Sequence, residues 1–153
     1  MKMLMYCLVA VSGTLSKAKD LDLEKVRNNF CVAASNKTIC QAMLTGLPQG
    51  DPTSTSRAYL GGFQAIWASH VFNPIKKMET FNKGKANIEQ AVTEDPSNVE
   101  IRFVRLSIQT HCPWFLPYHQ QEKEDRSFLI AHRGQVNSPT LKNMIDDILK
   151  ITE

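Results

Sequence analysis

Apolar residues recur at spacings of three and four along most of the chain, and this spacing predicts amphipathic helices. No stretch shows the sustained alternation of apolar and polar residues that is typical of a strand. The expected helices cover about residues 21–34, 37–47, 51–70, 75–94, 98–110 and 120–133, and a last one begins at Ser138-Pro139. The pattern therefore predicts an all-α protein, a compact bundle of about six to seven helices arranged as helical hairpins.

Start and stop signals delimit these helices. Asp51-Pro52 and Asn73-Pro74 each place an N-cap residue before a proline at the first helical position. Ser97 and Glu100 have the spacing of a capping box. All connections are short, so residues 19–153 are expected to form a single helical domain.

The helix at residues 51–70 carries an unusual stripe of small side chains. Its members are Ala58, Gly62, Ala65 and Ser69. The pair Gly61-Gly62 costs a helix about 1 kcal/mol per glycine relative to alanine. We therefore expect a neighbouring helix to approach closely at this point.

The helix at residues 98–110 is apolar on most sides, which predicts a central position in the fold. Its narrow polar row consists of Asn98, Arg102, Arg105 and Gln109. Arg102 and Arg105 have two interpretations. They form internal salt bridges with Glu89 or Asp125, which we favour, or they clamp the carboxylate of a ligand.

Residues 1–18 have the three regions of a signal peptide. Lys2 is followed by an apolar run from Leu4 to Val11, and small residues stand at Ser16 and Ala18. The run is shorter than the roughly 20 residues that cross a bilayer. We expect export, with cleavage near Ala18, a periplasmic or extracellular mature protein, and no membrane span in that mature chain.

The charge of the chain excludes one class of function. The formal net charge is +3, and Lys2 and Lys17 of the expected leader supply two of those charges. The remaining basic residues show no clustered basic face of the kind that nucleic-acid proteins carry. Nucleic acid is therefore not an expected partner.

Part of the chain resembles a tetratricopeptide repeat. Gly84, Ile88, Ala91 and Pro96 match the small, large, small and proline positions of the second helix of that repeat. The positions that hold Trp, Leu, Gly and Tyr in its first helix are here Ala68, Val71, Phe72 and Ile75. The resemblance therefore implies one repeat-like hairpin and no array of repeats.

A wider resemblance covers about residues 58–150. It rests on Asn73-Pro74, Phe81, Gly84, Pro96, residues 98–106, Phe115-Leu116 and Tyr118. This pattern is similar to an uncharacterised family of short exported helical proteins from Bacteroidota. The resemblance implies a helical fold and export, and it implies no catalytic residue.

Three cysteines remain after the expected leader, namely Cys31, Cys40 and Cys112. Cys31 and Cys40 lie near a shared turn and allow one disulfide bridge. The alternative, which we favour slightly, is three buried thiols that pack as small apolar groups.

No residue pattern predicts catalysis or a cofactor. His111-Cys112 with His119 does not match a compact zinc spacing, and no base or oxyanion donor accompanies a cysteine. Asp146-Asp147 are adjacent on a helix and point in different directions, as solvated residues do. We therefore expect a protein that is not an enzyme and has no bound metal or cofactor.

The connection after residue 112 is rich in aromatic side chains. Trp114, Phe115 and Tyr118 either plug the core between helices or form an exposed recognition patch. We expect a structural or protein-interaction role, with Arg102, Arg105, Trp114 and Tyr118 as the candidate contact surface and another protein as the partner. The alternative is a small-ligand binding module with a pocket near Trp67, Arg102, Arg105 and Tyr118.

Overall fold

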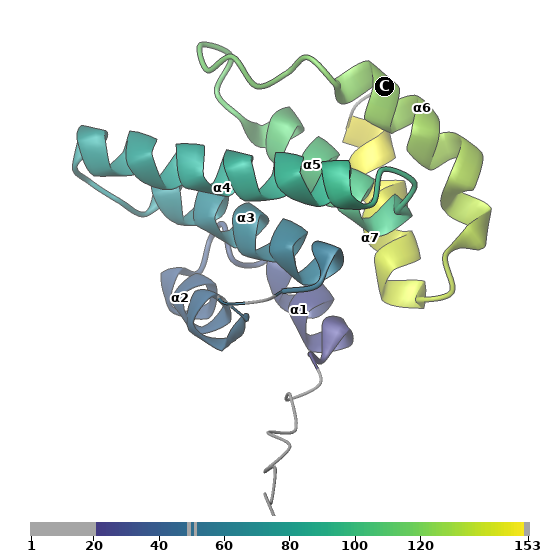
Figure 1. Ribbon diagram of the computed structural model, residues 1–153, viewed down its shortest axis with the longest axis horizontal. Coiled ribbons are helices and arrows are strands. Elements are labelled where there is room, and N and C mark those ends of the chain that lie inside the picture. The colour runs from purple at the N-terminus through teal and green to yellow at the C-terminus, as the bar shows by residue number, and fades with distance from the viewer. Residues whose placement is uncertain (1–20, 49, 51, 152–153) are drawn as a thin grey trace, which may run out of the picture.

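The computed structural model describes residues 21–48, 50 and 52–151 (Figure 1). These residues form seven α-helices and one short 3-10 helix, and they contain no strand. The elements are α1 (Leu23–Phe30), α2 (Lys37–Gly46), α3 (Ser54–Ser69), α4 (Pro74–Glu94), α5 (Val99–His111), α6 (Glu122–His132), η1 (Arg133–Gln135) and α7 (Pro139–Ile151). The expectation of an all-α bundle is confirmed.

Helices α3 and α4 form a hairpin that lies side by side along most of its length (Figure 1). Their backbones meet at Gly61 and Gly84. A methyl group added to Gly61 would lie 2.5 Å from the carbonyl oxygen of Gly84, and one added to Gly84 would lie 2.7 Å from the amide nitrogen of Ala65. The expected close approach at the glycine pair is confirmed, because only hydrogen atoms fit between the two helices.

The second glycine of the pair serves a different contact. A methyl group on Gly62 would lie 2.7 Å from the ring of Phe30 and 3.1 Å from Val104. The Phe30 ring also packs edge-on against Tyr59 and Phe63, at centroid distances of 5.3 and 5.4 Å. Gly62 therefore makes room for the aromatic cluster through which α1 joins the core.

Two of the expected helix caps differ from those in the structure. Helix α3 is capped by the side chain of Thr53, which accepts from the amide of Ser56, and begins later than the Asp51-Pro52 signal predicted. Helix α5 is capped by Asn98 and not by Ser97. In both places two eligible caps lie within two residues of each other, and the second one caps the helix. The cap of α4 by Asn73 with Pro74 following is confirmed.

Glu100 does not complete a capping box, because its carboxylate pairs with another helix. Arg27 of α1 donates two hydrogen bonds of 2.7 Å to it, and the hydroxyl of Tyr59 donates a third of 2.8 Å. Glu100 is buried, so these donors replace the water that it loses on folding. The carboxylate thereby ties α1, α3 and α5 together.

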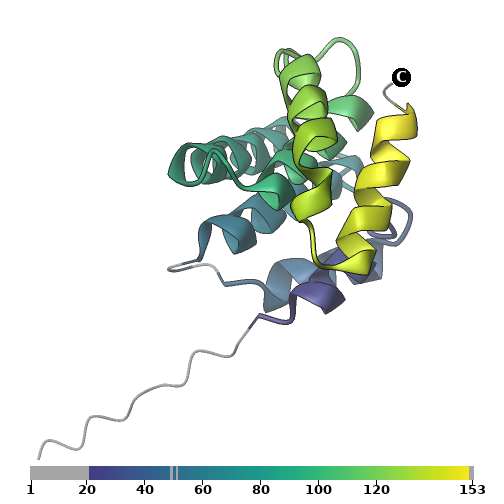
Figure 2. The same cartoon turned by 90° about the vertical axis from the view of Figure 1, so that its right-hand side faces the viewer.

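Helix α5 occupies the centre of the fold, as its apolar sequence predicted. It contacts α3, α4, α6 and α7. Ile101, Val104 and Leu106 are completely buried along it. Helices α6 and α7 pack on the side of α5 away from α2 (Figure 2).

The leader that the sequence predicts, residues 1–18, lies outside the described residues. Among the residues that the structure describes, no helix combines the length and apolar character that crossing a bilayer requires.

Candidate functional site

The connection between α5 and α6 is held at both ends. Cys112 at its start and Tyr118 near its end are buried. Between them, the amide of Leu116 donates to the carbonyl of Pro113 at 2.9 Å, and the amide of Tyr118 donates to Leu116 at 2.8 Å. We call residues 113–118 the aromatic loop. Figure 1 shows it projecting above α4.

Tyr118 anchors the aromatic loop to α4. Its hydroxyl donates a 2.7 Å hydrogen bond to the carboxylate of Glu89. Its ring packs edge-on against Phe81 at 6.0 Å, and the ammonium of Lys85 lies 4.9 Å from the ring centre. Burial, followed by the adjacent Glu89 carboxylate, raises the pKa of Tyr118 well above its usual range, so the hydroxyl remains a donor.

Glu89 links this anchor to an ion-pair network between α4, α5 and α6. Arg105 donates to Glu89 at 3.1 Å and holds Asp125 with two bonds of 2.6 and 2.8 Å. Arg102 donates to Asp125 at 2.7 Å and to Glu124 at 2.6 Å. Asp125 is completely buried and Arg105 nearly so. Each buried charge of the network is therefore paired with an opposite charge, which offsets the cost of removing it from water.

The Arg105 guanidinium is held by carboxylates of its own chain. Burial opposes the charge, but the bonds to Asp125 and Glu89 outweigh it and raise the pKa of Arg105. Its three nitrogens all donate to carboxylates of this chain. The internal salt bridges expected with Glu89 and Asp125 are therefore present.

The middle of the aromatic loop points into solvent. Trp114 is 88% exposed and Phe115 is 66% exposed, and their rings pack edge-on at 6.0 Å. Tyr118, in contrast, is 1% exposed. Each of the two sequence interpretations is thus right for part of the loop, since Tyr118 plugs the core and Trp114 with Phe115 forms an exposed patch.

The four residues of the expected ligand pocket are not brought together. Arg105 and Tyr118 meet through Glu89, and Arg102 joins them through Asp125. Trp67 instead lines a shallow groove of about 660 Å³ between α2, α3 and α4. That groove is lined by Gln41, Leu44, Thr45, Gln64, Trp67, Lys76, Glu79, Thr80 and Lys83.

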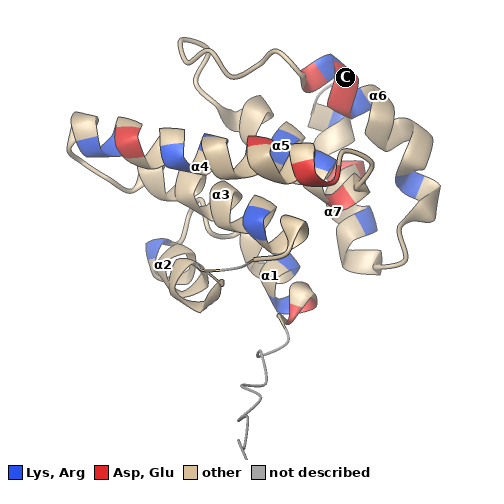
Figure 3. Ribbon diagram, viewed as in Figure 1, with Lys and Arg blue, Asp and Glu red and all other residues tan. Residues whose placement is uncertain are grey.

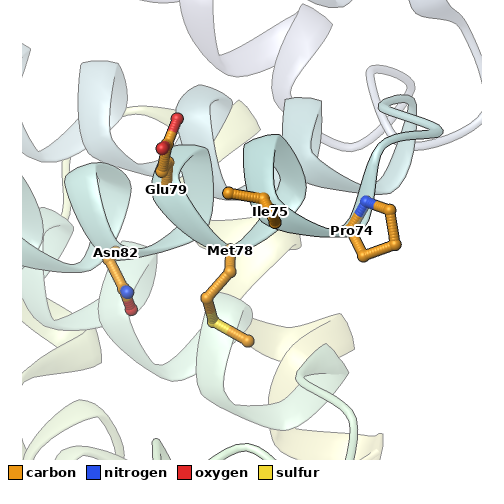
Figure 4. Close-up of a pocket in the computed structure, with 5 residues that line it drawn as sticks. All are labelled: Pro74, Ile75, Met78, Glu79 and Asn82. Carbon is orange, nitrogen blue, oxygen red and sulfur yellow. The ribbon is translucent and has the colours of Figure 1, made fainter.

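The exposed start of α4 is a feature that the sequence reasoning missed. Ile75 and Met78 have the three-residue spacing of an apolar helix face, but they are 71% and 42% exposed. They line an open hollow of about 390 Å³ with Pro74, Glu79 and Asn82. In Figure 4, Met78 and Asn82 point to one side of the helix and Glu79 points to the other. The spacing of Ile75 and Met78 is that of buried residues, so the local sequence gives no signal of this exposure.

The cysteines of the described residues are all free thiols, namely Cys31, Cys40 and Cys112. The alternative of a bridge between Cys31 and Cys40 is therefore not found, and the favoured alternative of free thiols holds. Cys40 and Cys112 are buried as expected, whereas Cys31 is exposed. Burial raises the pKa of Cys40 to about 11, which suppresses its thiolate. No group of three metal-ligating side chains converges within the described part of the chain.

Comparison with known proteins gives no relative from which a function transfers. No protein family, no curated protein and no solved structure matches the chain. The site must therefore be interpreted from its own geometry.

Proposed function

We propose that this chain is an exported protein-interaction domain without catalysis, and that it contacts its partner through the aromatic loop. The observation that carries this proposal is the exposure of Trp114 and Phe115 on a loop whose ends are fixed by buried side chains. The buried arginine network serves to hold that loop in place and does not itself contact the partner.

Two physical arguments support a contact surface at this loop. Aromatic side chains bury a large area at low cost in rotamer freedom, and they dominate the energy of protein interfaces. A loop already fixed by Tyr118 and by the backbone bond between Leu116 and Pro113 loses little further freedom on binding. Trp114 and Phe115 are thus presented in a defined arrangement before any partner arrives.

The α3–α4 hairpin belongs to the proposal as its scaffold. Gly84, Ile88 and Ala91, which carry the tetratricopeptide resemblance, are all buried. A helical hairpin of that kind supports the interaction role, because such hairpins hold binding surfaces on rigid neighbouring elements. The relationship to tetratricopeptide repeats stays part of the proposal.

Site-specific crosslinking in the native host tests the interaction. A photoreactive residue at Phe115 should crosslink to one defined protein, and the same residue at Ile130 should not. Ile130 is the matched control because it is 53% exposed on α6. The double variant W114S/F115S should lose the partner and keep its free energy of unfolding within about 0.5 kcal/mol, since both side chains are solvated. Unchanged partner recovery by this variant would contradict the proposal.

Export is tested separately. Mass spectrometry of the protein recovered from its native host should show a mature chain that begins near Lys19. Intact Met1 in all of the recovered protein would contradict export and leave the loop proposal untouched.

A further inference from the structure

The start of α4 projects beyond the helices that cover the rest of it. Every residue from 72 to 79 is exposed, and we call this segment the α4 tip. Phe72, in the turn before the helix, is 96% exposed, and Ile75 and Met78 follow it on the first two helical turns. The tip therefore carries three large apolar side chains that the described part of the chain leaves exposed, Phe72 almost entirely and Met78 in part.

The charges around the α4 tip are mostly positive. Lys76 and Lys77 lie in the tip, Lys83 and Lys85 lie on the next turns, and Glu79 is the only acidic residue from 72 to 85. Figure 3 shows basic residues in blue along the first half of α4. Glu79 lies 3.5 Å from Lys76, and both side chains are largely exposed.

The helix dipole adds to this positive potential. The first turn of α4 has no acidic residue, so the lysines face the positive end of their own helix. That placement opposes the usual preference for acidic residues in a first turn, as Glu122 and Glu124 show in α6. The lysines and the helix dipole repel each other in the protein alone. An external anion that lies against the tip would offset this repulsion.

We propose that the α4 tip docks on an anionic lipid surface. Phe72 and Ile75 enter the boundary between headgroups and acyl chains, and Lys76 and Lys77 lie against the acidic headgroups. This inference does not depend on the proposed function, because the aromatic loop and the tip share no residue.

The shape and charge of the tip suit a lipid surface. Its apolar side chains stand on an exposed end of a helix, and the hollow that they line is open. A bilayer accepts such an apolar end when basic side chains surround it, because the apolar groups enter the boundary of the acyl chains while the charges stay at the headgroups.

The experiment reads the position of the tip directly. The chain contains Trp67 and Trp114 as its tryptophans. In a W67F/W114F background, F72W is mixed with vesicles of phosphatidylcholine alone or with 30% phosphatidylglycerol, some carrying brominated acyl chains. With anionic vesicles, the fluorescence emission of the tryptophan at residue 72 should shift to the blue, and brominated acyl chains should quench it. A tryptophan at Ile130, in the same background, should show neither change.

A second measurement uses the otherwise unmodified chain. K76Q/K77Q should bind anionic vesicles about thirtyfold more weakly, since each lysine near such a surface contributes about 1 kcal/mol. K123Q/K150Q removes the same charge from α6 and α7 and should change binding much less. Residues 1–20 are identical in all variants, so they cannot cause a difference between them.

Three results would overturn the inference. The first is a solvated emission spectrum at residue 72 with anionic vesicles. The second is equal loss of binding in the two lysine pairs. The third is a shift at residue 72 with polyglutamate and none with vesicles, which would assign the tip to an acidic protein.

Discussion

The hydroxyl of Tyr118 and the carboxylate of Glu89 form a 2.7 Å hydrogen bond that joins the aromatic loop to α4. Glu89 also accepts from Arg105, so a single carboxylate serves both the loop and the buried ion pairs. The loop is consequently fixed by the same residues that hold α4, α5 and α6 together.

Removing parts of this anchor should destabilise the protein in steps. Tyr118→Phe loses one hydrogen bond and should lower the free energy of unfolding by about 1 kcal/mol. Tyr118→Ala also empties a buried aromatic site and should cost about 3–5 kcal/mol. Urea denaturation measures both. An alanine variant as stable as the phenylalanine variant would show that the ring does not fill the core.

The glycine contact between α3 and α4 should resist enlargement. Gly61→Ala and Gly84→Ala each place a methyl group against backbone atoms and should cost about 1–3 kcal/mol, although alanine is the better helix former. Gly46→Ala is the control, because no atom lies within 4 Å of the added group. The melting temperature should fall for the first two variants and stay level or rise for Gly46→Ala. The same response at all three positions would contradict the close contact.

The buried ion pair should be costly to break from one side. Arg105→Met leaves Asp125 in the core with Arg102 as its remaining partner, and should cost about 3–5 kcal/mol. Arg57→Met breaks the more exposed pair with Glu94 and should cost about 1 kcal/mol or less. Chemical denaturation distinguishes the two. R105M/D125N should recover part of the loss, since it also removes the buried carboxylate that has lost its two bonds from Arg105. A fully additive double variant would count against coupling.

His119 should titrate above the ordinary histidine range. Its hydrogen bond with Glu122, at 2.6 Å, raises its pKa above 6.5. A raised pKa in the folded state means that the pair stabilises the protein fully below pH 6.5 and that this contribution is lost as the pH rises through the folded-state pKa. The contribution is small because both side chains are partly solvated. An NMR titration of His119 should give a midpoint above 6.5. The Glu122→Gln variant should lower this midpoint. Equal midpoints in the two proteins would refute the pairing.

Much of the helical framework follows from the sequence alone. The helical spacing of apolar residues and the capping signals predict where α4 and α7 begin to within a residue or two. This works because a proline and the cap before it act locally. The pairing of Arg105 with Asp125 was also predictable, since a charge on a mostly apolar helix needs a partner.

Other features, such as which apolar side chains are exposed, depend on the packing between helices. The local sequence pattern carries no information about that packing. Ile75 and Met78 have the spacing of buried residues, but α4 outruns its neighbours there and leaves them exposed. Trp114 and Tyr118 belong to one aromatic connection, and only the position of Glu89 and Phe81 decides that Tyr118 is the buried one. Cys31 is exposed although Phe30 and Ala33, which lie close to it in the sequence, are buried.

Helix α4 connects the two exposed surfaces of this protein. It carries the exposed Ile75 at one end, touches Gly61 of α3 through Gly84 near its middle, and holds the aromatic loop through Glu89 further on. Because α4 also packs along most of α3, its exposed start and the carboxylate that holds the aromatic loop belong to one helical hairpin. The two exposed surfaces are therefore carried by the same hairpin and have no separate loop between them.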